Sequence, residues 1–183
     1  MIVVLMGVSG VGKTTIGKLL SARTGWKFED ADDYHSQENR QKMTAGIPLT
    51  DADRKPWLNA LHEHMLQYHR SGESAILACS ALKREYREIL AGGFAKNEIQ
   101  LVYLHAPAAL IKERMKLRHH PYMNPGLLES QLATLQIPSG ALSVNVAGSP
   151  REATEEILAR LREAGLLTTG GEIAGRRNNV AER

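Results

Sequence analysis

The fold is decided by one stretch near the start of the chain, Ile2-Val3-Val4-Leu5-Met6-Gly7-Val8-Ser9-Gly10-Val11-Gly12-Lys13-Thr14. Its first five residues are apolar and largely β-branched, which is typical of a strand buried in a parallel sheet. Three glycines follow, and residues 13–23 then have the periodicity of a helix. A glycine-rich turn between a strand and a helix lets backbone N–H groups surround an anion at the positive end of the helix dipole. The stretch therefore predicts a phosphate-binding loop in an α/β fold.

Residues 7–14 match the Walker A pattern G-x-x-x-x-G-K-T without a gap. In this pattern Lys13 contacts the β- and γ-phosphates of ATP, and the hydroxyl of Thr14 is a ligand of Mg²⁺. The predicted nucleotide-binding residues are Gly7, Val8, Ser9, Gly10, Val11, Gly12, Lys13, Thr14 and Thr15. A glycine-rich turn that binds nothing is the alternative, and the predicted strand before it and helix after it argue against that alternative.

Apolar and amphipathic segments alternate along the rest of the chain. Further strands are predicted at residues 26–29, 75–79, 101–104 and 142–146, and helices at 37–43, 53–69, 82–90, 107–118, 127–135 and 150–164. Asp53 is the predicted N-cap of the helix 53–69, which places Pro56 in its first turn. Alternation of this kind predicts a five-stranded parallel sheet with helices on both faces, a three-layer sandwich of the P-loop NTPase class.

The length and composition are those of one globular domain, which we assign to residues 1–167. The glycine- and arginine-rich tail 168–183 is predicted to be disordered. A net charge of +3 and an aromatic content of 5% argue against a nucleic-acid partner. No apolar run is long enough to span a membrane, the start of the chain lacks the features of a signal peptide, and a single cysteine excludes an internal disulfide. We expect a cytoplasmic protein.

The class of P-loop protein follows from the segments that accompany the loop. The sequence lacks the DxxG and NKxD segments of a switch GTPase, and 183 residues are too few for a large ATPase motor. A small kinase remains, and its acceptor is expected at the carboxyl ends of the strands. A mobile lid over about residues 119–138 is expected to exclude water, with Arg114 and Arg118 near the phosphates. Arg118 is thus a predicted catalytic residue and Arg114 a predicted nucleotide-binding residue.

The acceptor side is predicted from residues that follow the second and third strands. Asp30 and Asp32 alternate toward one side of an extended chain and are expected to hold Mg²⁺ through water and to bind substrate hydroxyls. Asp32 is the predicted base for the attacking hydroxyl. An acidic turn that caps the next helix is the alternative, especially for Asp33.

Cations are also expected at the acceptor site. Arg54 is expected to bind a substrate carboxylate through its planar guanidinium. Lys55 next to it is either a second substrate cation or an ordinary solvated charge at the start of a helix, and the two interpretations are about even. Ser80 and Lys83 lie at a predicted helix N-terminus, which favours anions. Cys79 is predicted to be a buried core thiol rather than a nucleophile.

The blocks around these residues resemble the gluconate kinases, a family related to shikimate and nucleoside-monophosphate kinases. The matching residues, spread over 4–138, are Met6 to Thr14, Asp30-Ala31-Asp32-Asp33-Tyr34-His35, Asn39, Lys42-Met43, Gly46-Ile47-Pro48-Leu49, Asp51, Asp53-Arg54, Pro56-Trp57-Leu58, Cys79-Ser80-Ala81-Leu82-Lys83, Tyr86-Arg87, Leu90, Ser130-Gln131, Thr134-Leu135 and Pro138. The resemblance implies phosphorylation of D-gluconate to 6-phospho-D-gluconate by ATP and Mg²⁺ in a homodimer.

The resemblance also has a departure and leaves alternatives. His120-Pro121-Tyr122 stands where the family has Gly-His-Phe after the lid arginine, so no role is assigned to His120. The alternative acceptors are another sugar acid or shikimate. A nucleotide-binding sensor without turnover is the alternative from a different functional class.

Overall fold

A five-stranded parallel sheet organises the protein, which is described here from a computed structural model covering residues 1–116 and 125–167. The strands are β1 (Ile2–Met6), β2 (Lys27–Asp30), β3 (Ala75–Ala78), β4 (Ile99–His105) and β5 (Leu142–Asn145). Their order in the sheet is β2-β3-β1-β4-β5, and every neighbouring pair is parallel. The first strand thus lies at the centre, as its continuous apolar sequence predicts.

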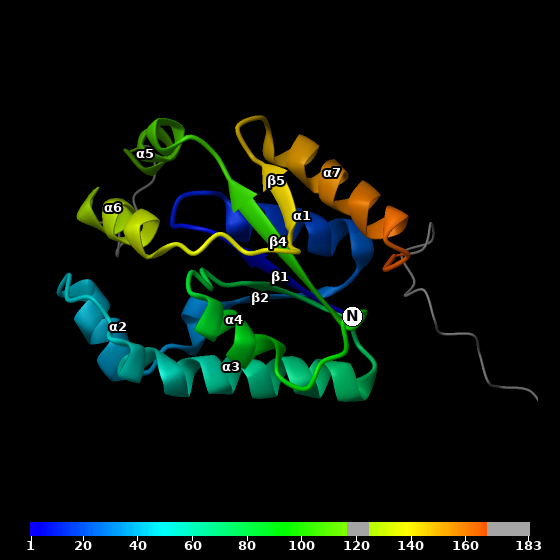
Figure 1. Cartoon of the computed structure of the whole chain (residues 1–183), viewed down its shortest axis with the longest axis horizontal. Helices are drawn as coiled ribbons and strands as arrows, with labels where there is room; N and C mark the ends of the chain where they lie inside the picture. The colour runs from blue at the N-terminus through cyan, green and yellow to red at the C-terminus, as the bar shows by residue number, and fades with distance from the viewer. Residues whose placement is uncertain (117–124, 168–183) are drawn as a thin grey trace, which may run out of the picture.

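Helices cover both faces of this sheet (Figure 1). Residues of α1 (Lys13–Thr24), α5 (Ala108–Lys116), α6 (Pro125–Thr134) and α7 (Pro150–Glu163) pack in one core, and those of α3 (Asp51–Ser71) and α4 (Arg84–Ala91) pack in the other. The 3₁₀ helix η1 (Ala31–Tyr34) and α2 (Gln37–Thr44) connect β2 to α3. The predicted three-layer α/β sandwich is confirmed.

The central strand contributes to both cores. Val3 and Leu5 belong to the core on the α1 and α7 side, whereas Ile2, Val4 and Met6 belong to the core on the α3 and α4 side. Successive side chains of a strand point to opposite faces, so each face of β1 needs its own apolar residues. This requirement explains why β1 has no polar position.

Glycine allows α1 to approach the sheet closely. A Cβ atom built on Gly17 would lie 2.3 Å from the Phe28 ring of β2 and 3.3 Å from Leu5. A larger residue would push the helix away from the strand that precedes it, and with it the loop from which the helix starts. Gly17 therefore helps to set the position of the phosphate-binding loop against the sheet.

Two predicted helix starts were wrong. Thr50, not Asp53, is the N-cap of α3; the Thr50 side chain accepts from the backbone N–H of Asp53, and the Asp53 side chain accepts from that of Thr50. This reciprocal capping box starts the helix earlier, so Pro56 lies inside the helix and not in its first turn. The next helix, α4, begins at Arg84 rather than at residue 82.

The remaining boundaries differ from the predicted ones by a few residues. The tail 168–183 and the part of the expected lid at 119–124 lie outside the described residues. In the described part of the expected lid, α6 is followed by residues that return to the core, where Leu135 packs against both clusters. No helix within residues 1–116 or 125–167 has the length and apolar character that a membrane span requires.

Candidate nucleotide and acceptor site

The predicted site residues that the structure describes meet at one edge of the sheet. Because all strands are parallel, their carboxyl ends lie on the same edge, which is where α/β enzymes bind ligands. The loop after β1 and the turn after β3 are joined there, since the backbone N–H of Gly7 donates to the carbonyl of Ser80 at 3.3 Å. Ala81 in that turn has a φ of 42°, a left-handed conformation that is unusual for a residue with a side chain.

The loop between β1 and α1 has the backbone shape that a phosphate cradle needs. Gly7, Gly10 and Gly12 have φ values of 142°, 81° and 108°, which residues with side chains rarely adopt. A Cβ on Gly7 would lie 2.5 Å from the carbonyl oxygen of Leu104, so the loop also requires glycine for space. Gly12 caps α1 without a side-chain hydrogen bond, which leaves the first amides of the helix to a bound anion.

Lys13 lies over this loop. Its Nζ donates to the carbonyls of Gly7 and Val8 at 2.9 and 3.1 Å. Burial lowers the pKa of Lys13, although the nearby carboxylates of Asp32 and Asp30 act in the opposite direction. A long side chain that donates to two backbone carbonyls can turn toward a phosphate, which is the stronger acceptor.

Oxygen atoms suited to Mg²⁺ lie beside the loop. The hydroxyl of Thr14 donates to Oδ2 of Asp30 at 2.8 Å, and Oδ1 of Asp30 accepts from the backbone N–H of Asp32 at 3.2 Å. Among the described residues no group of three or more His, Cys, Asp or Glu side chains gathers into a metal site. One hydroxyl with one carboxylate fits Mg²⁺, because this ion keeps several waters and takes its other ligands from substrate phosphates.

The acidic turn differs from its prediction in one respect. Asp32 lies in the 3₁₀ helix η1, so Asp30 and Asp32 do not alternate along an extended chain. The Asp30 carboxylate caps this short helix, because an aspartate accepts readily from an amide two residues later. The structure nevertheless joins the acidic turn to the start of α1, because Asp30 accepts from the Thr14 hydroxyl and from the Asp32 amide.

Trp57 fixes the acidic turn, a role that the sequence did not reveal. Its indole Nε1 donates to the carbonyl of Ala31 at 2.8 Å, and its ring stacks on that of His35 with centroids 4.3 Å apart. His35 is buried, its Nε2 lies 3.9 Å from Oδ1 of Asp32, and its Nδ1 has no partner among the described residues. Burial, helped by the charges of Arg54 and Arg40, lowers the pKa of His35 to about 4.

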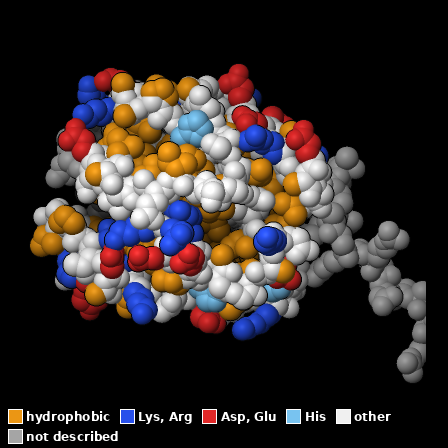
Figure 2. Space-filling model, viewed as in Figure 1, with side chains coloured by type: hydrophobic (Ala, Val, Ile, Leu, Met, Phe, Trp, Pro, Cys, Tyr) orange, Lys and Arg blue, Asp and Glu red, His pale blue; other side chains and the backbone are white. Residues whose placement is uncertain are grey.

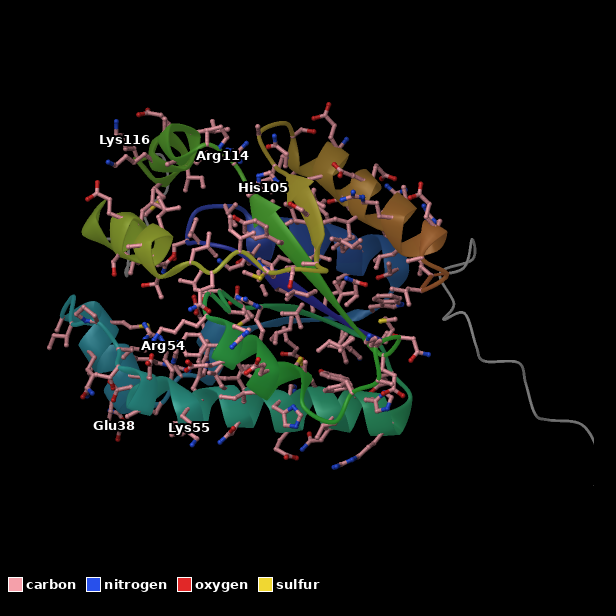
Figure 3. All side chains as sticks on the ribbon, viewed as in Figure 1. Glu38, Arg54, Lys55, His105, Arg114 and Lys116 are labelled. Atoms are coloured by element: carbon pink, nitrogen blue, oxygen red, sulfur yellow. The ribbon has the colours of Figure 1, made fainter. Side chains whose placement is uncertain are left out.

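The two predicted substrate cations, Arg54 and Lys83, lie together. Lys83 Nζ is 5.5 Å and the Arg54 guanidinium 5.8 Å from the centre of the Tyr86 ring. Arg54 points from α3 into the molecule, whereas its neighbour Lys55 points outward (Figure 3), and Lys55 is exposed. The solvated alternative for Lys55 is therefore the one that the structure supports.

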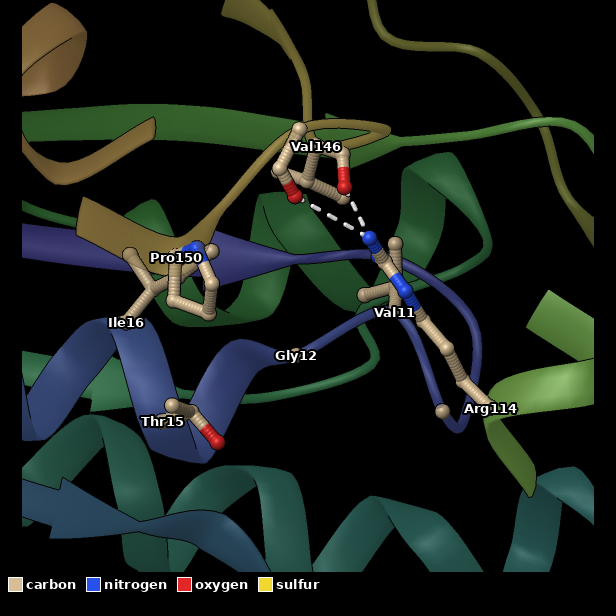
Figure 4. A pocket seen from close by; sticks show the side chains of 9 residues that line it. Val11, Gly12, Thr15, Ile16, Arg114, Val146 and Pro150 are labelled. Atoms are coloured by element: carbon tan, nitrogen blue, oxygen red, sulfur yellow. Dashed lines mark hydrogen bonds between the residues drawn. The ribbon is translucent and has the colours of Figure 1, made fainter. Parts of the chain in front are cut away.

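Arg114 lines a pocket beside the loop. Its guanidinium donates to the carbonyls of Val146 and Gly148 at 2.7 and 3.1 Å (Figure 4). It also donates to the carbonyl of Ala147 at 3.1 Å. The pocket has a volume of about 190 Å³. It is lined by Gly10, Val11, Gly12, Thr15, Ile16, Arg114, Val146, Gly148 and Pro150. A partly apolar pocket that continues from a phosphate cradle has the character of a site for a nucleoside.

Comparison with known proteins shows the family of this chain. A family model described as Shikimate kinase matches residues 9–139. The chain is 41% identical over 179 residues to the "Probable gluconokinase" of Mus musculus, covering 88% of this chain and 97% of that protein. It is 44% identical over 135 residues to the "Gluconokinase" of Gluconobacter oxydans (strain 621H), covering 74% of this chain and 75% of that protein. The crystal structure of a gluconokinase from Sinorhizobium meliloti 1021 has a TM-score of 0.79 and 40% identity to this chain, and the match covers 88% of this chain and 91% of that one.

The chain belongs to the gluconokinase family, and it is a kinase. The predicted family resemblance is thereby confirmed. As in the prediction for this family, the loop, the acidic turn and the two cations share one edge of the sheet. The roles of the individual residues stay predictions, and Arg118 with the His120 departure lies outside the described residues.

Two glutamines of this gluconokinase-family chain also reach the site. Gln131 of α6 accepts from the backbone N–H of Ser9 at 2.6 Å and donates to the Ser9 hydroxyl at 3.0 Å. Gln136 accepts from the first amide of α4, that of Arg84, at 2.7 Å, in place of an N-cap side chain. Ser130-Gln131 belonged to the resemblance without a role, and no local pattern shows which loop a glutamine on another helix will contact.

Proposed function

We propose that this kinase transfers the γ-phosphoryl group of ATP to the terminal hydroxyl of D-gluconate, giving 6-phospho-D-gluconate and ADP. One observation carries the proposal: the phosphate loop with Lys13, the acidic turn with Asp32 and the cations Arg54 and Lys83 lie at one edge of the sheet. A polyol acid needs carboxylates for its hydroxyls and cations for its own carboxylate. The names of the relatives support gluconate as that acid.

The donor side binds ATP through the loop and the adjoining pocket. The amides of residues 7–15 surround the phosphates, Lys13 turns from its two carbonyls to the β- and γ-phosphates, and the nucleoside enters the pocket beside Arg114. Thr14 and Asp30, which lie in contact beside the loop, would hold Mg²⁺, Asp30 through water. When bound, Mg²⁺ neutralises charge on the phosphates and orients them.

The acceptor side prepares the hydroxyl for attack. The oxygen of the terminal hydroxyl bonds to the γ-phosphorus, and Asp32 accepts the proton of that hydroxyl. The bond from the γ-phosphorus to the β-γ bridging oxygen breaks, and ADP leaves. Trp57 holds the backbone of the turn that carries Asp32. Arg54, Lys83 and Ser80 bind the far end of the substrate. Charge on the transferring group is further offset by Arg118, whose position the described residues do not include.

A coupled assay with purified protein, Mg²⁺-ATP and D-gluconate tests the proposal. Shikimate, other sugar acids and a nucleoside monophosphate serve as the acceptor panel. Turnover is expected to be highest with D-gluconate. Turnover of shikimate or of a nucleotide, with no turnover of D-gluconate, would overturn the proposal. Lys13→Ala is expected to lower kcat by about a hundredfold or more while the fold is retained. If the wild type and Lys13→Ala were both inactive toward every acceptor while the wild type still bound nucleotide, a nucleotide-binding sensor without turnover would be favoured instead.

We propose three further features of this kinase. They are a homodimer, a cytoplasmic location and a lid over about residues 119–138 that closes over ATP. Sedimentation equilibrium tests the first, because a mass near twice 20.2 kDa is expected. Hydrogen exchange of the segment with and without an ATP analogue tests the lid, since closure protects its amides.

A further inference from the structure

The two cations proposed to bind the substrate carboxylate already bind a carboxylate of the protein. Lys83 Nζ lies 2.8 and 2.6 Å from the two carboxylate oxygens of Asp51, the first helical residue of α3. The Tyr86 hydroxyl also donates to Asp51, and the Arg54 guanidinium lies 3.9 Å from it. Asp51, Arg54, Lys83 and Tyr86 are called the Asp51 cluster below.

The charges of the Asp51 cluster do not cancel. Arg54 and Lys83 carry two positive charges, and Asp51 supplies one negative charge. Arg54 donates in addition to a neutral acceptor, the carbonyl of Leu49, at 2.6 Å. The cluster therefore retains attraction for one more anion. Basic and acidic side chains also lie next to one another on the lower half of the face in Figure 2, where Figure 1 places α3 and α4.

The members of the cluster differ in exposure. The Asp51 side chain is 56% exposed, whereas those of Lys83 and Arg54 are 27% and 32% exposed. The protein carboxylate thus lies on the solvent side, and the cations lie deeper. Solvent-exposed ion pairs contribute little to stability, so a ligand carboxylate can take the place of Asp51 at a small cost.

We propose that Asp51 is an internal competitor for the substrate carboxylate and so limits the affinity of the site for sugar acids. In the empty enzyme its carboxylate occupies Lys83 and Tyr86, and a sugar acid must displace it from these donors. A sugar acid therefore gains one ion pair at the cost of another, whereas a neutral polyol leaves the pair of Asp51 and Lys83 in place. Asp51 thereby lowers the affinity for acids more than the affinity for neutral sugars of the same length. This inference rests on the proposed binding of gluconate by Arg54 and Lys83.

Binding of D-gluconate and of the neutral polyol D-glucitol, measured by calorimetry with a non-hydrolysable ATP analogue present, tests the inference. Asp51→Asn keeps the shape and removes the competing charge. It is expected to tighten gluconate binding about threefold to fivefold, the scale of an exposed ion pair. Binding of glucitol is expected to change much less. Glu63→Gln, an exposed residue of the same helix, makes the same change in net charge and is expected to leave both affinities unchanged.

A double-mutant cycle separates competition from mere support of the site. Once Lys83→Ala has removed the cation, adding Asp51→Asn is expected to bring no further gain in gluconate binding. Weaker gluconate binding by Asp51→Asn, or equal gains in Asp51→Asn and Glu63→Gln, would overturn the inference while leaving the proposed function intact. Failure of the wild-type protein to bind or phosphorylate gluconate would overturn the proposed function and the inference together. Circular dichroism of each variant checks that it is folded.

Discussion

Gln131 and Ser9, 122 residues apart in the chain, form two hydrogen bonds through the Gln131 amide. This pair attaches α6 to the third residue of the phosphate loop. Gln131→Glu keeps an acceptor for the Ser9 amide, loses the donor to the Ser9 hydroxyl and places a negative charge beside the phosphates. Like charges at close range repel, so KM for ATP is expected to rise about tenfold. Steady-state kinetics with varied ATP at saturating gluconate measure this change.

The matched control for this prediction is Gln67→Glu, the same replacement at an exposed position of α3. It is expected to leave KM for ATP unchanged. Gln131→Ala removes both hydrogen bonds without adding charge, and it is expected to lower the free energy of unfolding by about 1–2 kcal/mol. If Gln131→Glu and Gln131→Ala raised KM for ATP equally, charge repulsion would not be the cause.

The Thr14–Asp30 contact gives a second prediction, on the metal requirement. Asp30→Asn retains an acceptor for Thr14 but removes a charge that attracts the cation. The Mg²⁺ concentration for half-maximal activity is expected to rise about tenfold, with activity recovering at high Mg²⁺. Glu38→Gln, an exposed acid of α2, is the control for the general loss of negative charge. An unchanged Mg²⁺ dependence of Asp30→Asn would place the metal elsewhere.

The sequence predicted the loop residues because their function depends on backbone conformation, which local glycines determine. It also placed both acidic residues after the second strand but did not predict their geometry, since Asp30 caps a 3₁₀ helix and the turn is bound at Ala31 by Trp57 of the distant helix α3. The contacts of Ser9 with Gln131 and of Lys83 with Asp51 join separate helices and loops. Such pairs are fixed by how the elements pack, and periodicity carries no signal for them.

The buried imidazole of His35 predicts a dependence of stability on pH. Its pKa of about 4 in the folded protein lies below the value of 6.5 expected in the unfolded chain. Between these pH values the unfolded chain binds a proton that the folded protein does not, so stability is full above pH 6.5 and is lost as the pH falls toward 4. This one group changes the free energy of unfolding by up to about 1.4 kcal/mol per pH unit.

Urea unfolding at several values between pH 7 and 4.5 measures this slope. His35→Gln is expected to have a shallower slope than the wild type, and His69→Gln, a partly exposed histidine of α3, to keep the wild-type slope. The charged groups that face His35 are Asp32, Arg40 and Arg54, and all three remain in both variants. Parallel slopes for wild type and His35→Gln would show that the imidazole is not the group that titrates.

The close packing of α1 on β2 predicts the effect of one methyl group. Gly17→Ala places a Cβ 2.3 Å from the Phe28 ring, so the ring or the helix must shift. Overpacking of this kind is expected to lower the free energy of unfolding by about 1–2 kcal/mol, after the better helix propensity of alanine is counted. Gly92→Ala, whose Cβ would meet its nearest atom at 3.5 Å, is the control and is expected to be nearly neutral. Combining Gly17→Ala with Phe28→Val is expected to recover part of the loss, and no recovery would assign the cost to another contact.

Cys79 allows a final prediction about reactivity next to the site. The thiol is buried at the end of β3, and burial raises its pKa to about 12 despite the charge of Lys13. Only the thiolate attacks a disulfide reagent, so a shift from 9 to about 12 lowers the reactive fraction about a thousandfold at neutral pH. Because this is the single cysteine of the chain, absorbance of released thionitrobenzoate reports on it alone. The native protein is expected to react very slowly and the urea-unfolded protein to release one equivalent rapidly. Release of one equivalent from native protein within minutes would contradict the buried, protonated thiol and would mean that the edge of the sheet beside Lys13 opens readily.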